Sequence, residues 1–178
     1  ESHHFKTLAK DVLPELIARA RDGQRVRIWS AGCSTGQEPY TIAMQALTAT
    51  SDLAKYDFRI LATDIDREVL NTARAATYPM REANGIPDEM QKAFLTKGGA
   101  SDSFSMSPAV RDLVAFRHLN LIADWPMKHR CDVIFCRNVV IYFDEIVQAS
   151  LWPRFANALH DGGWFFLGHS ERLDAAMA

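Results

Sequence analysis

Several features are scarce in this sequence of 178 residues. No apolar run approaches the roughly 18 to 20 residues that a bilayer-spanning helix needs, so we expect no membrane insertion. Basic residues form no long block, and 20 Lys and Arg against 22 Asp and Glu give a formal net charge of −2. Proteins that hold nucleic acid by its phosphates need dense positive charge. The sequence therefore predicts no nucleic-acid partner.

Cysteine is also sparse. Cys33, Cys131 and Cys136 are odd in number and lack the paired spacing of a zinc site or of a secreted disulfide framework. We expect no metal site and a reducing, cytoplasmic setting. The first ten residues, ESHHFKTLAK, contain neither the basic nor the apolar region of a signal peptide. A chain of this length suits one compact domain over residues 1–178.

An alternation of helical and strand patterns is what the sequence does contain. A helix is predicted over about 5–20, because apolar residues recur at three- and four-residue steps and so share one helical face; they are Leu8, Val12, Leu13, Leu16 and Ile17. Alternating strand and helix signals then continue along the chain and favour an α/β fold, with a mostly parallel central sheet and helices on both faces. The predicted strands cover 26–31, 57–66, about 114–119, the run CDVIFC and the stretch after Gly162-Gly163, and the later predicted helices cover about 69–76 and 145–159.

The stretch of about 78–117 breaks this alternation. It contains a short helical candidate, DEMQKAFL, two adjacent glycines and a Ser-rich patch. We interpret it as an inserted subdomain built on a small antiparallel sheet, which leads into the predicted third strand.

The turn AGCSTG, which follows the first predicted strand, is the first candidate site. A phosphate loop would need Lys and a hydroxyl where Gln37 and Glu38 stand. Cys33 and Ser34 break the spacing of a dinucleotide fingerprint. A nucleophile elbow at Cys33 would need His and Asp partners, which no motif marks, so Cys33 is better interpreted as a packing residue. The turn can still approach a ligand closely, because Gly32 permits positive φ.

Three polar residues near predicted strand ends favour a ligand without phosphate. Glu38 suits a cationic or hydroxyl-bearing ligand, although a carboxylate there could also serve the helix dipole. Asp64 could accept hydrogen bonds from ribose hydroxyls, with helix capping by Asp64 or Asp66 as the alternative. Asn120 could bind an adenine edge or form a turn. S-adenosylmethionine, with an ammonium, a sulfonium and a ribose diol, fits this set.

Several segments together resemble one family. RIWSAGCSTGQEPYTIAM, ILATDIDREVLNTARAATY, HLNL, VIFCRNVVIYFD and GGWFFLGHSE occur in the order found in the CheR-type bacterial chemoreceptor glutamate O-methyltransferases. The resemblance implies a class I, Rossmann-like methyltransferase domain. It would transfer a methyl group from S-adenosylmethionine to receptor glutamates, giving glutamyl methyl esters and S-adenosylhomocysteine.

The same resemblance implies roles for individual residues. Tyr142 would lie near the transferred methyl, although a core ring is the alternative. A surface ion pair is the alternative for Arg137, and the turn with Gly32 and Ser34 would form the floor of the cofactor site. Apart from the resemblance, a basic residue of the leading helix, Arg19 or Arg21, could steer the acceptor carboxylate. The cofactor contacts would be Glu38, Asp64, Asn120, Leu121, Arg137 and Asn138.

The resemblance also implies partners and leaves alternatives open. The partners would be cytoplasmic helices of methyl-accepting chemoreceptors, and in some members the β-subdomain also docks a receptor C-terminal peptide. Relative to the family pattern, Gln37 replaces a glutamate, and the N-terminal helical domain and the final strand are absent from this sequence. The alternatives are a methyltransferase for nucleic acid or small molecules, one serving another sensory system, or a cofactor-binding signalling module without turnover.

Overall fold

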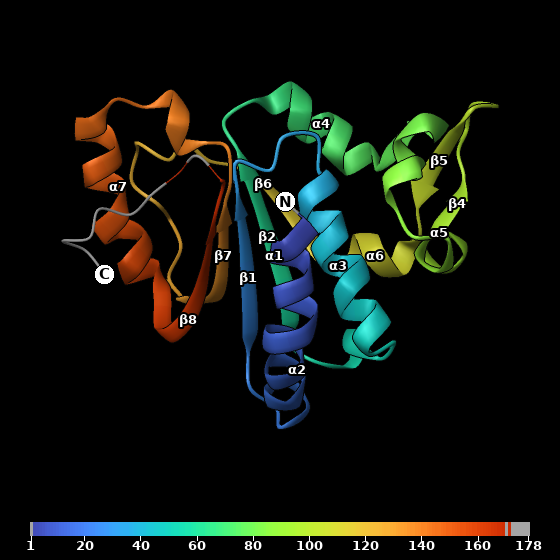
Figure 1. Ribbon diagram of the computed structural model, residues 1–178, viewed down its shortest axis with the longest axis horizontal. Helices are drawn as coiled ribbons and strands as arrows, with labels where there is room; N and C mark the ends of the chain where they lie inside the picture. The colour runs from blue at the N-terminus through green and yellow to red at the C-terminus, as the bar shows by residue number, and fades with distance from the viewer. Residues whose placement is uncertain (1, 170, 172–178) are drawn as a thin grey trace.

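The computed structural model describes residues 2–169 and 171. Its central sheet has five strands in the order β6-β2-β1-β7-β8, and every neighbouring pair is parallel (Figure 1). The predicted α/β class with a parallel sheet is therefore confirmed. The strands are β1 (Val26–Ala31), β2 (Phe58–Asp64), β6 (Val114–His118), β7 (Cys131–Cys136) and β8 (Leu159–Leu167).

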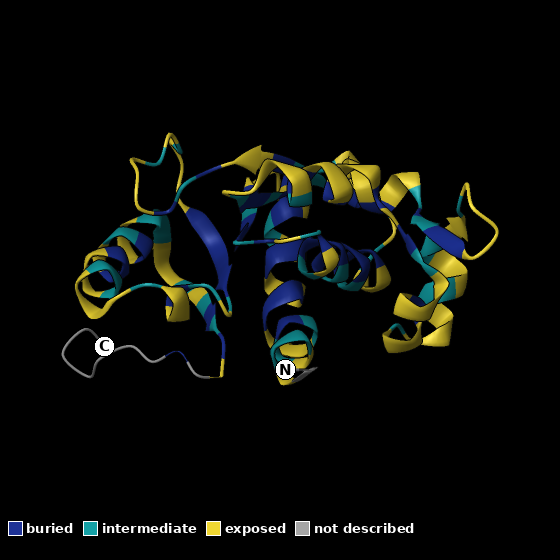
Figure 2. Ribbon diagram, turned by 90° about the horizontal axis from the view of Figure 1, so that it is seen from above, coloured by how far each residue is buried: buried dark blue, intermediate teal, exposed yellow. Residues whose placement is uncertain are grey.

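Helices cover both faces of this sheet. Side chains alternate across a strand, so Ile28 of β1 packs into one apolar cluster and Trp29 into another. The first cluster lies under α2 (Leu13–Arg21), α3 (Gln37–Ala49) and α4 (Arg67–Ala75), and the second under α7 (Glu145–Ala158). Figure 2 shows buried residues along the strands and exposed residues on the outer sides of the helices.

The leading helix is confirmed as helical but is not one regular α-helix. α1 (Ser2–Thr7) passes into a π-helical turn, η1 (Leu8–Val12), before α2 begins. Pro14 stands in the first turn of α2 and has no N–H to donate, which removes one regular i→i−4 bond at this junction. The predicted apolar face is confirmed, because Leu8, Val12, Leu13, Leu16 and Ile17 are all buried.

A second, antiparallel sheet stands apart from the central one (Figure 1). Its strands have the order β3-β5-β4, and all of them lie between residues 77 and 106. Tyr78 connects this sheet to the rest of the molecule, since its hydroxyl donates to Thr35 O at 2.7 Å. The elements are β3 (Thr77–Pro79), η3 (Met80–Gly85), α5 (Asp88–Phe94), β4 (Leu95–Lys97), β5 (Ser103–Met106) and α6 (Pro108–Asp112).

The last described strand begins earlier than the sequence indicates. The Gly162-Gly163 pair was expected as a turn before the strand, but β8 already begins at Leu159. The pairing with β7 shifts from Cys131↔Leu159 to Val133↔Trp164, so four residues of β8 lie opposite a single residue of β7. Gly162 has φ 77° and permits this bulge. The glycines therefore distort the strand from within.

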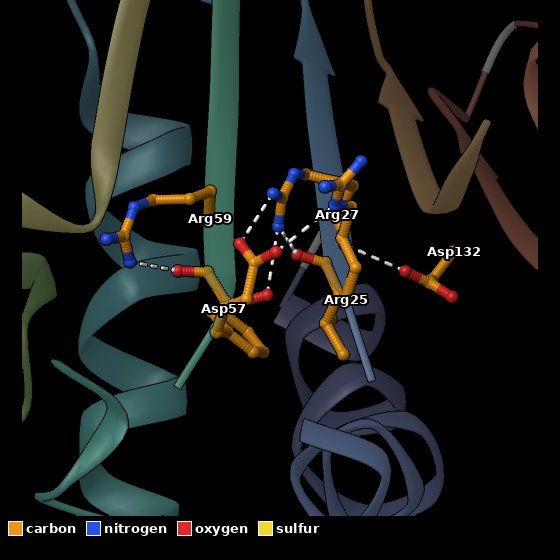
Figure 3. A network of polar contacts seen from close by, with 7 residues as sticks. Arg25, Arg27, Asp57, Arg59 and Asp132 are labelled. Carbon is orange, nitrogen blue, oxygen red and sulfur yellow. Dashed lines mark hydrogen bonds and ion pairs between the residues drawn. The ribbon is translucent and has the colours of Figure 1, made fainter. Parts of the chain in front are cut away.

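Charged side chains gather where the parallel strands begin (Figure 3). Asp57, just before β2, lies 2.5 Å from Arg27 Nη2 and 3.1 Å from Arg25 Nε. These hydrogen bonds, that of Arg27 first, hold the pKa of Asp57 below its usual value. Asp132 of β7 accepts the backbone N–H of Arg27 at 2.7 Å. The network joins the start of β1 to both neighbouring strands.

A helix that spans a bilayer needs about 20 mostly apolar residues, and the helices of the described residues fall short of this. None is both long enough and apolar enough to cross a bilayer.

Candidate functional site

The turn after β1 is held by the end of β2. Gly32 has φ 75°, and its N–H donates to Thr63 O at 2.8 Å. Ser34 has φ 48°, a conformation that is rare for a residue with a side chain, and its N–H donates to Asp64 Oδ2 at 2.8 Å. The carboxylate of Asp64 therefore fixes the turn as well as facing the space beyond it.

The two aspartates after β2 have separate roles. Asp66 is the cap of α4, because its Oδ1 accepts the N–H of Glu68 at 2.7 Å and that of Val69 at 3.4 Å. Asp64 accepts the N–H of Asp66 at 3.0 Å through its other oxygen. The capping alternative thus applies to Asp66, and Asp64 remains the candidate for a ligand.

Asn120 follows β6 and takes part in a turn. Its Oδ1 accepts the N–H of Ile122 at 3.0 Å, so the turn interpretation is confirmed. Asn120 nevertheless borders the same space as Asp64, as does Leu121. The backbone oxygen of Leu121 is held by Trp125 Nε1 at 3.0 Å and by Arg154 Nη1 at 2.8 Å. This segment is therefore anchored from its far side.

Glu38 and Arg137 form an ion pair behind the turn. Arg137 Nη1 lies 3.0 Å from Glu38 Oε2, and Ser30 Oγ donates to Glu38 Oε1 at 2.7 Å. The side chains are 13% and 17% exposed, so the pair is largely buried and the alternative of a surface ion pair for Arg137 is wrong. Neither residue is among the described residues that line the cavity beyond the turn. Their direct contact with a cofactor stays a prediction.

The loop after β7 completes the site. Asn138 has φ 57°, a left-handed conformation that asparagine tolerates better than most residues. Tyr142 ends the short helix η4 (Val140–Tyr142) and is 81% exposed. The alternative of a core ring for Tyr142 is therefore wrong, and its hydroxyl is available to a partner in solution.

These segments enclose a cavity of about 470 Å³ at the carboxyl ends of the strands. Its volume lies within the range usual for small-molecule sites. Of the predicted site residues, it brings together Gly32, Ser34, Asp64, Asn120, Leu121, Asn138 and Tyr142. The apolar residues that line the cavity were not predicted from the sequence, although each of them is next to a predicted site residue in the chain. They are Ile65, Leu119, Ile122, Val139 and Phe143.

Gly32 lets two walls of the cavity, the turn after β1 and the loop after β7, approach each other closely. A Cβ added at Gly32 would come within 2.3 Å of Val139 Cγ2, so a larger residue would push the turn away from the loop after β7. Both walls of the cavity therefore depend on this one close approach.

Cys33 belongs to the core beneath the turn. It is free and buried, and burial, with the nearby Asp64 carboxylate, raises the pKa of its thiol to about 12. The thiolate needed for nucleophilic attack is not populated near neutral pH. This agrees with the interpretation of Cys33 as a packing residue.

Arg19 and Arg21 are placed at the other end of the sheet. Arg19 Nη2 lies 2.8 Å from Asp132 Oδ1, close enough for an ion pair although not aligned as a hydrogen bond. Arg21 donates to Thr50 Oγ1 at 2.8 Å. The suggestion that either one steers an acceptor carboxylate was wrong, because α2 runs toward the start of β1 and carries both residues away from the cavity.

Comparison with known proteins gives a family match over the whole chain. The family model described as CheR methyltransferase, SAM binding domain, matches residues 1–178. A probable chemotaxis protein methyltransferase of Rhizobium etli is 49% identical over 175 residues, covering 97% of this chain and 65% of the relative. Chemotaxis protein methyltransferase 2 of Pseudomonas aeruginosa is 41% identical over 178 residues, covering 97% of this chain and 61% of the relative.

The chain thus spans less than two thirds of the length of these curated relatives. Among solved structures, the glycopeptide N-methyltransferase MtfA complexed with sinefungin aligns with a TM-score of 0.49 and 14% identity. That alignment covers 88% of this chain and 48% of MtfA.

Proposed function

The chain belongs to the CheR methyltransferase family, and we propose that its protein methylates glutamate side chains of bacterial chemoreceptors with S-adenosylmethionine. The products are glutamyl methyl esters and S-adenosylhomocysteine. The observation that carries the proposal is the cavity at the strand ends, which has the Asp64 carboxylate on one side and the exposed Tyr142 on the other.

The residues of the cavity fit this cofactor. Asp64 is a carboxylate at the end of β2, a position suited to a ribose diol. Asn120 keeps an amide N–H₂ group that can donate to an adenine edge, and its oxygen is used by the Ile122 turn. Leu119, Leu121 and Ile122 supply apolar surface for a purine ring. Gly32, Ser34 and Asn138 border the remaining part of the site.

Glu38 and Arg137 would act from behind the turn. Their ion pair connects the start of α3 to the loop after β7. A cationic ammonium group would be attracted by Glu38 if the pair opened toward the cavity. Both residues are proposed cofactor contacts, Glu38 for the ammonium group and Arg137 for the carboxylate of the methionine part.

The proposed reaction requires no general base from the protein. S-adenosylmethionine, when bound, supplies an electrophilic methyl group on a sulfonium. A glutamate has an ordinary pKa of about 4.3 and is already an anion near neutral pH. A carboxylate oxygen would bond to the methyl carbon as the carbon–sulfur bond broke, so no proton would have to move. Alignment and partial desolvation of the carboxylate are then the main contributions of the site.

Tyr142 is the proposed catalytic residue. Its exposed position at the cavity lets the hydroxyl donate to an incoming carboxylate and orient it. Tyr142→Phe should lower kcat about tenfold and leave the dissociation constant of S-adenosylhomocysteine unchanged. Full turnover by this variant would remove the role.

The direct test uses the full-length protein with methyl-labelled S-adenosylmethionine and receptor cytoplasmic fragments. We expect label in the receptor that is released by mild base, as esters are. Cofactor binding with no ester on any fragment would favour a signalling module or another protein substrate. Label that resists base would contradict transfer to a carboxylate.

The proposed partners are the cytoplasmic helices of chemoreceptors, which places the reaction in the bacterial cytoplasm during signal transduction. The antiparallel sheet of β3, β5 and β4 corresponds to the inserted subdomain, for which we propose docking of a receptor C-terminal peptide. Titration of the full-length protein with receptor tail peptides tests this, and an absence of response to all of them would argue against docking.

A further inference from the structure

Glu171 is held in an unusual way, by the backbone of the loop that borders the cavity. We propose that Glu171 is a positioning residue, which fixes the loop of residues 137–142 so that Asn138 and Tyr142 face the cofactor and the acceptor. The effect of Glu171 on catalysis rests on the proposed function. The hydrogen bonds that hold the loop do not depend on which substrate is methylated.

Four backbone N–H groups donate to the carboxylate of Glu171. Oε1 accepts from Val139 N at 2.8 Å and from Val140 N at 2.9 Å. Oε2 accepts from Asn138 N at 3.0 Å and from Gly168 N at 2.6 Å. Consecutive N–H groups that converge in this way form an anion-binding concavity. Here the anion is a side chain of the protein itself.

Because Glu171 is buried, its carboxylate and the N–H groups around it need each other as hydrogen-bond partners. Glu171 is only 7% exposed, and a buried carboxylate is tolerated when hydrogen bonds replace its lost hydration. Conversely, the N–H groups of residues 138–140 would lack these acceptors without it, and an unsatisfied buried N–H is costly. The carboxylate and the loop therefore stabilise each other.

The packing around Gly168 shows that the approach is tight. A Cβ added at Gly168 would lie 2.7 Å from Glu171 Oε2 and 2.9 Å from Asn138 N. A side chain at this position would separate the carboxylate from the loop. Glycine at the end of β8 thus makes room for the contact.

The held loop is the one that carries the site. Asn138 adopts its left-handed conformation where its N–H meets Glu171. Val139 is the residue against which Gly32 closes, and Tyr142 donates its N–H to Val139 O at 3.2 Å. A change in the amides of 138–140 would therefore shift both the cavity wall and the position of the Tyr142 ring.

On the opposite wall of the cavity, the turn after β1 is also held by a carboxylate that accepts a backbone N–H. Asp64 accepts the N–H of Ser34, which is also left-handed, and so fixes the turn after β1. Two carboxylates, one on each wall, each hold a residue with positive φ at the cavity. Asp64 also faces the cavity, whereas Glu171 is not among the described residues that line it. Glu171 is therefore assigned to positioning and not to contact with the ligand.

Glu171→Gln in the full-length protein is the main test. The side-chain N–H₂ would point a donor at backbone donors, so we expect the dissociation constant of S-adenosylhomocysteine to rise about tenfold. Hydrogen exchange at the amides of 138–140 should accelerate about tenfold, with little change in β1 and β2. Glu171→Asp keeps the charge on a shorter side chain, so it should raise the dissociation constant and the exchange rate by smaller factors. This variant replaces the first one if Glu171→Gln does not fold.

Asp132→Asn is the matched control, because Asp132 is also buried and accepts a backbone N–H at the other end of the sheet. A purely structural role for Glu171 predicts that both variants lower thermal stability while ligand affinity and local exchange at 138–140 stay within twofold of wild type. That result would overturn the inference.

The readouts separate this inference from the proposed function. Binding of S-adenosylhomocysteine and exchange at 138–140 require no receptor. If both change in Glu171→Gln while no receptor fragment is ever esterified, the positioning role stands and the proposed substrate fails. If esters form and Glu171→Gln esterifies receptors with wild-type kcat and KM, the positioning role fails and the function stands.

Discussion

The two ends of the central sheet satisfy their carboxylates differently. Where the strands begin, Asp57 is paired with Arg25 and Arg27 (Figure 3), and Asp132 is paired with Arg19. Where the strands end, Asp64 and Glu171 accept backbone N–H groups of the loops. The contacts at the first end, including the bond from Arg27 N to Asp132, join neighbouring strands and helices, while the backbone bonds at the second end determine the shape of a loop. One end therefore stabilises the fold and the other shapes a site.

Asp132→Ala should have the largest effect and should act on stability. The substitution removes the acceptor of Arg27 N and leaves Arg19 without its ion-pair partner. We expect a loss of about 2 kcal/mol in the free energy of unfolding. This is less than the roughly 3–5 kcal/mol for breaking a fully buried pair, because Arg19 is partly exposed. Urea denaturation measures it. A large change in cofactor affinity instead would show that the two ends are not independent.

Asp64→Ala should act on binding. It removes both the proposed ribose acceptor and the anchor of Ser34 N, so the affinity for S-adenosylhomocysteine should fall at least about tenfold, or about 1.4 kcal/mol. Calorimetric titration of the full-length protein gives the value. Asp66→Ala is the control, since Asp66 only caps α4 and should affect stability more than binding.

Glu38→Ala should lower the same affinity by a smaller factor, about fivefold. The substitution removes the carboxylate that Arg137 Nη1 contacts at 3.0 Å, and with it the negative charge proposed to attract the ammonium group of the cofactor. The measurement is again calorimetry with S-adenosylhomocysteine. Wild-type affinity in both the Asp64 and the Glu38 variants would remove the cofactor assignment of this end of the sheet.

Asp57→Asn should have the smallest effect and should depend on pH. The pKa of Asp57 is lowered in the folded state by its hydrogen bonds to Arg27 and Arg25. Such a group stabilises the protein above its unfolded pKa of about 4, and the contribution disappears as pH falls through the lower folded value. Because the pair is half-exposed, we expect at most about 0.5 kcal/mol at pH 7.

Urea unfolding of Asp57→Asn and wild type between pH 7 and pH 3 tests this. The difference between them should be constant near neutrality and should shrink below about pH 4. A difference that grows on acidification would have the wrong sign for a carboxylate with a lowered pKa.

The elements could be predicted from local patterns because their causes are local. The apolar residues Leu8 to Ile17 recur at helical spacing, and all of those predicted to be buried are buried. The motif segments also identified the family. The start of β8 was missed because its bulge depends on pairing with Cys131 and Val133, which lie outside the window of any local pattern.

The site was predictable where a residue stands at the end of a strand. Asp64, Asn120 and Asn138 follow β2, β6 and β7, and parallel strands bring such residues to one edge. The roles of Arg19 and Glu171 were not predictable in this way. Arg19 was expected to face the substrate, and only the direction of α2 over the sheet shows that it binds Asp132 instead.

The sequence by itself determined the order of helices and strands, the nature of the turn after the first strand and the family. Those properties depend on periodicity, on glycine positions and on residues close together in the chain. The tertiary structure alone decided which partner each charged group found. Glu38 meets Arg137 across 99 residues, and Glu171 meets Asn138 across 33. A carboxylate takes the nearest donor in space, and that donor is brought near by packing.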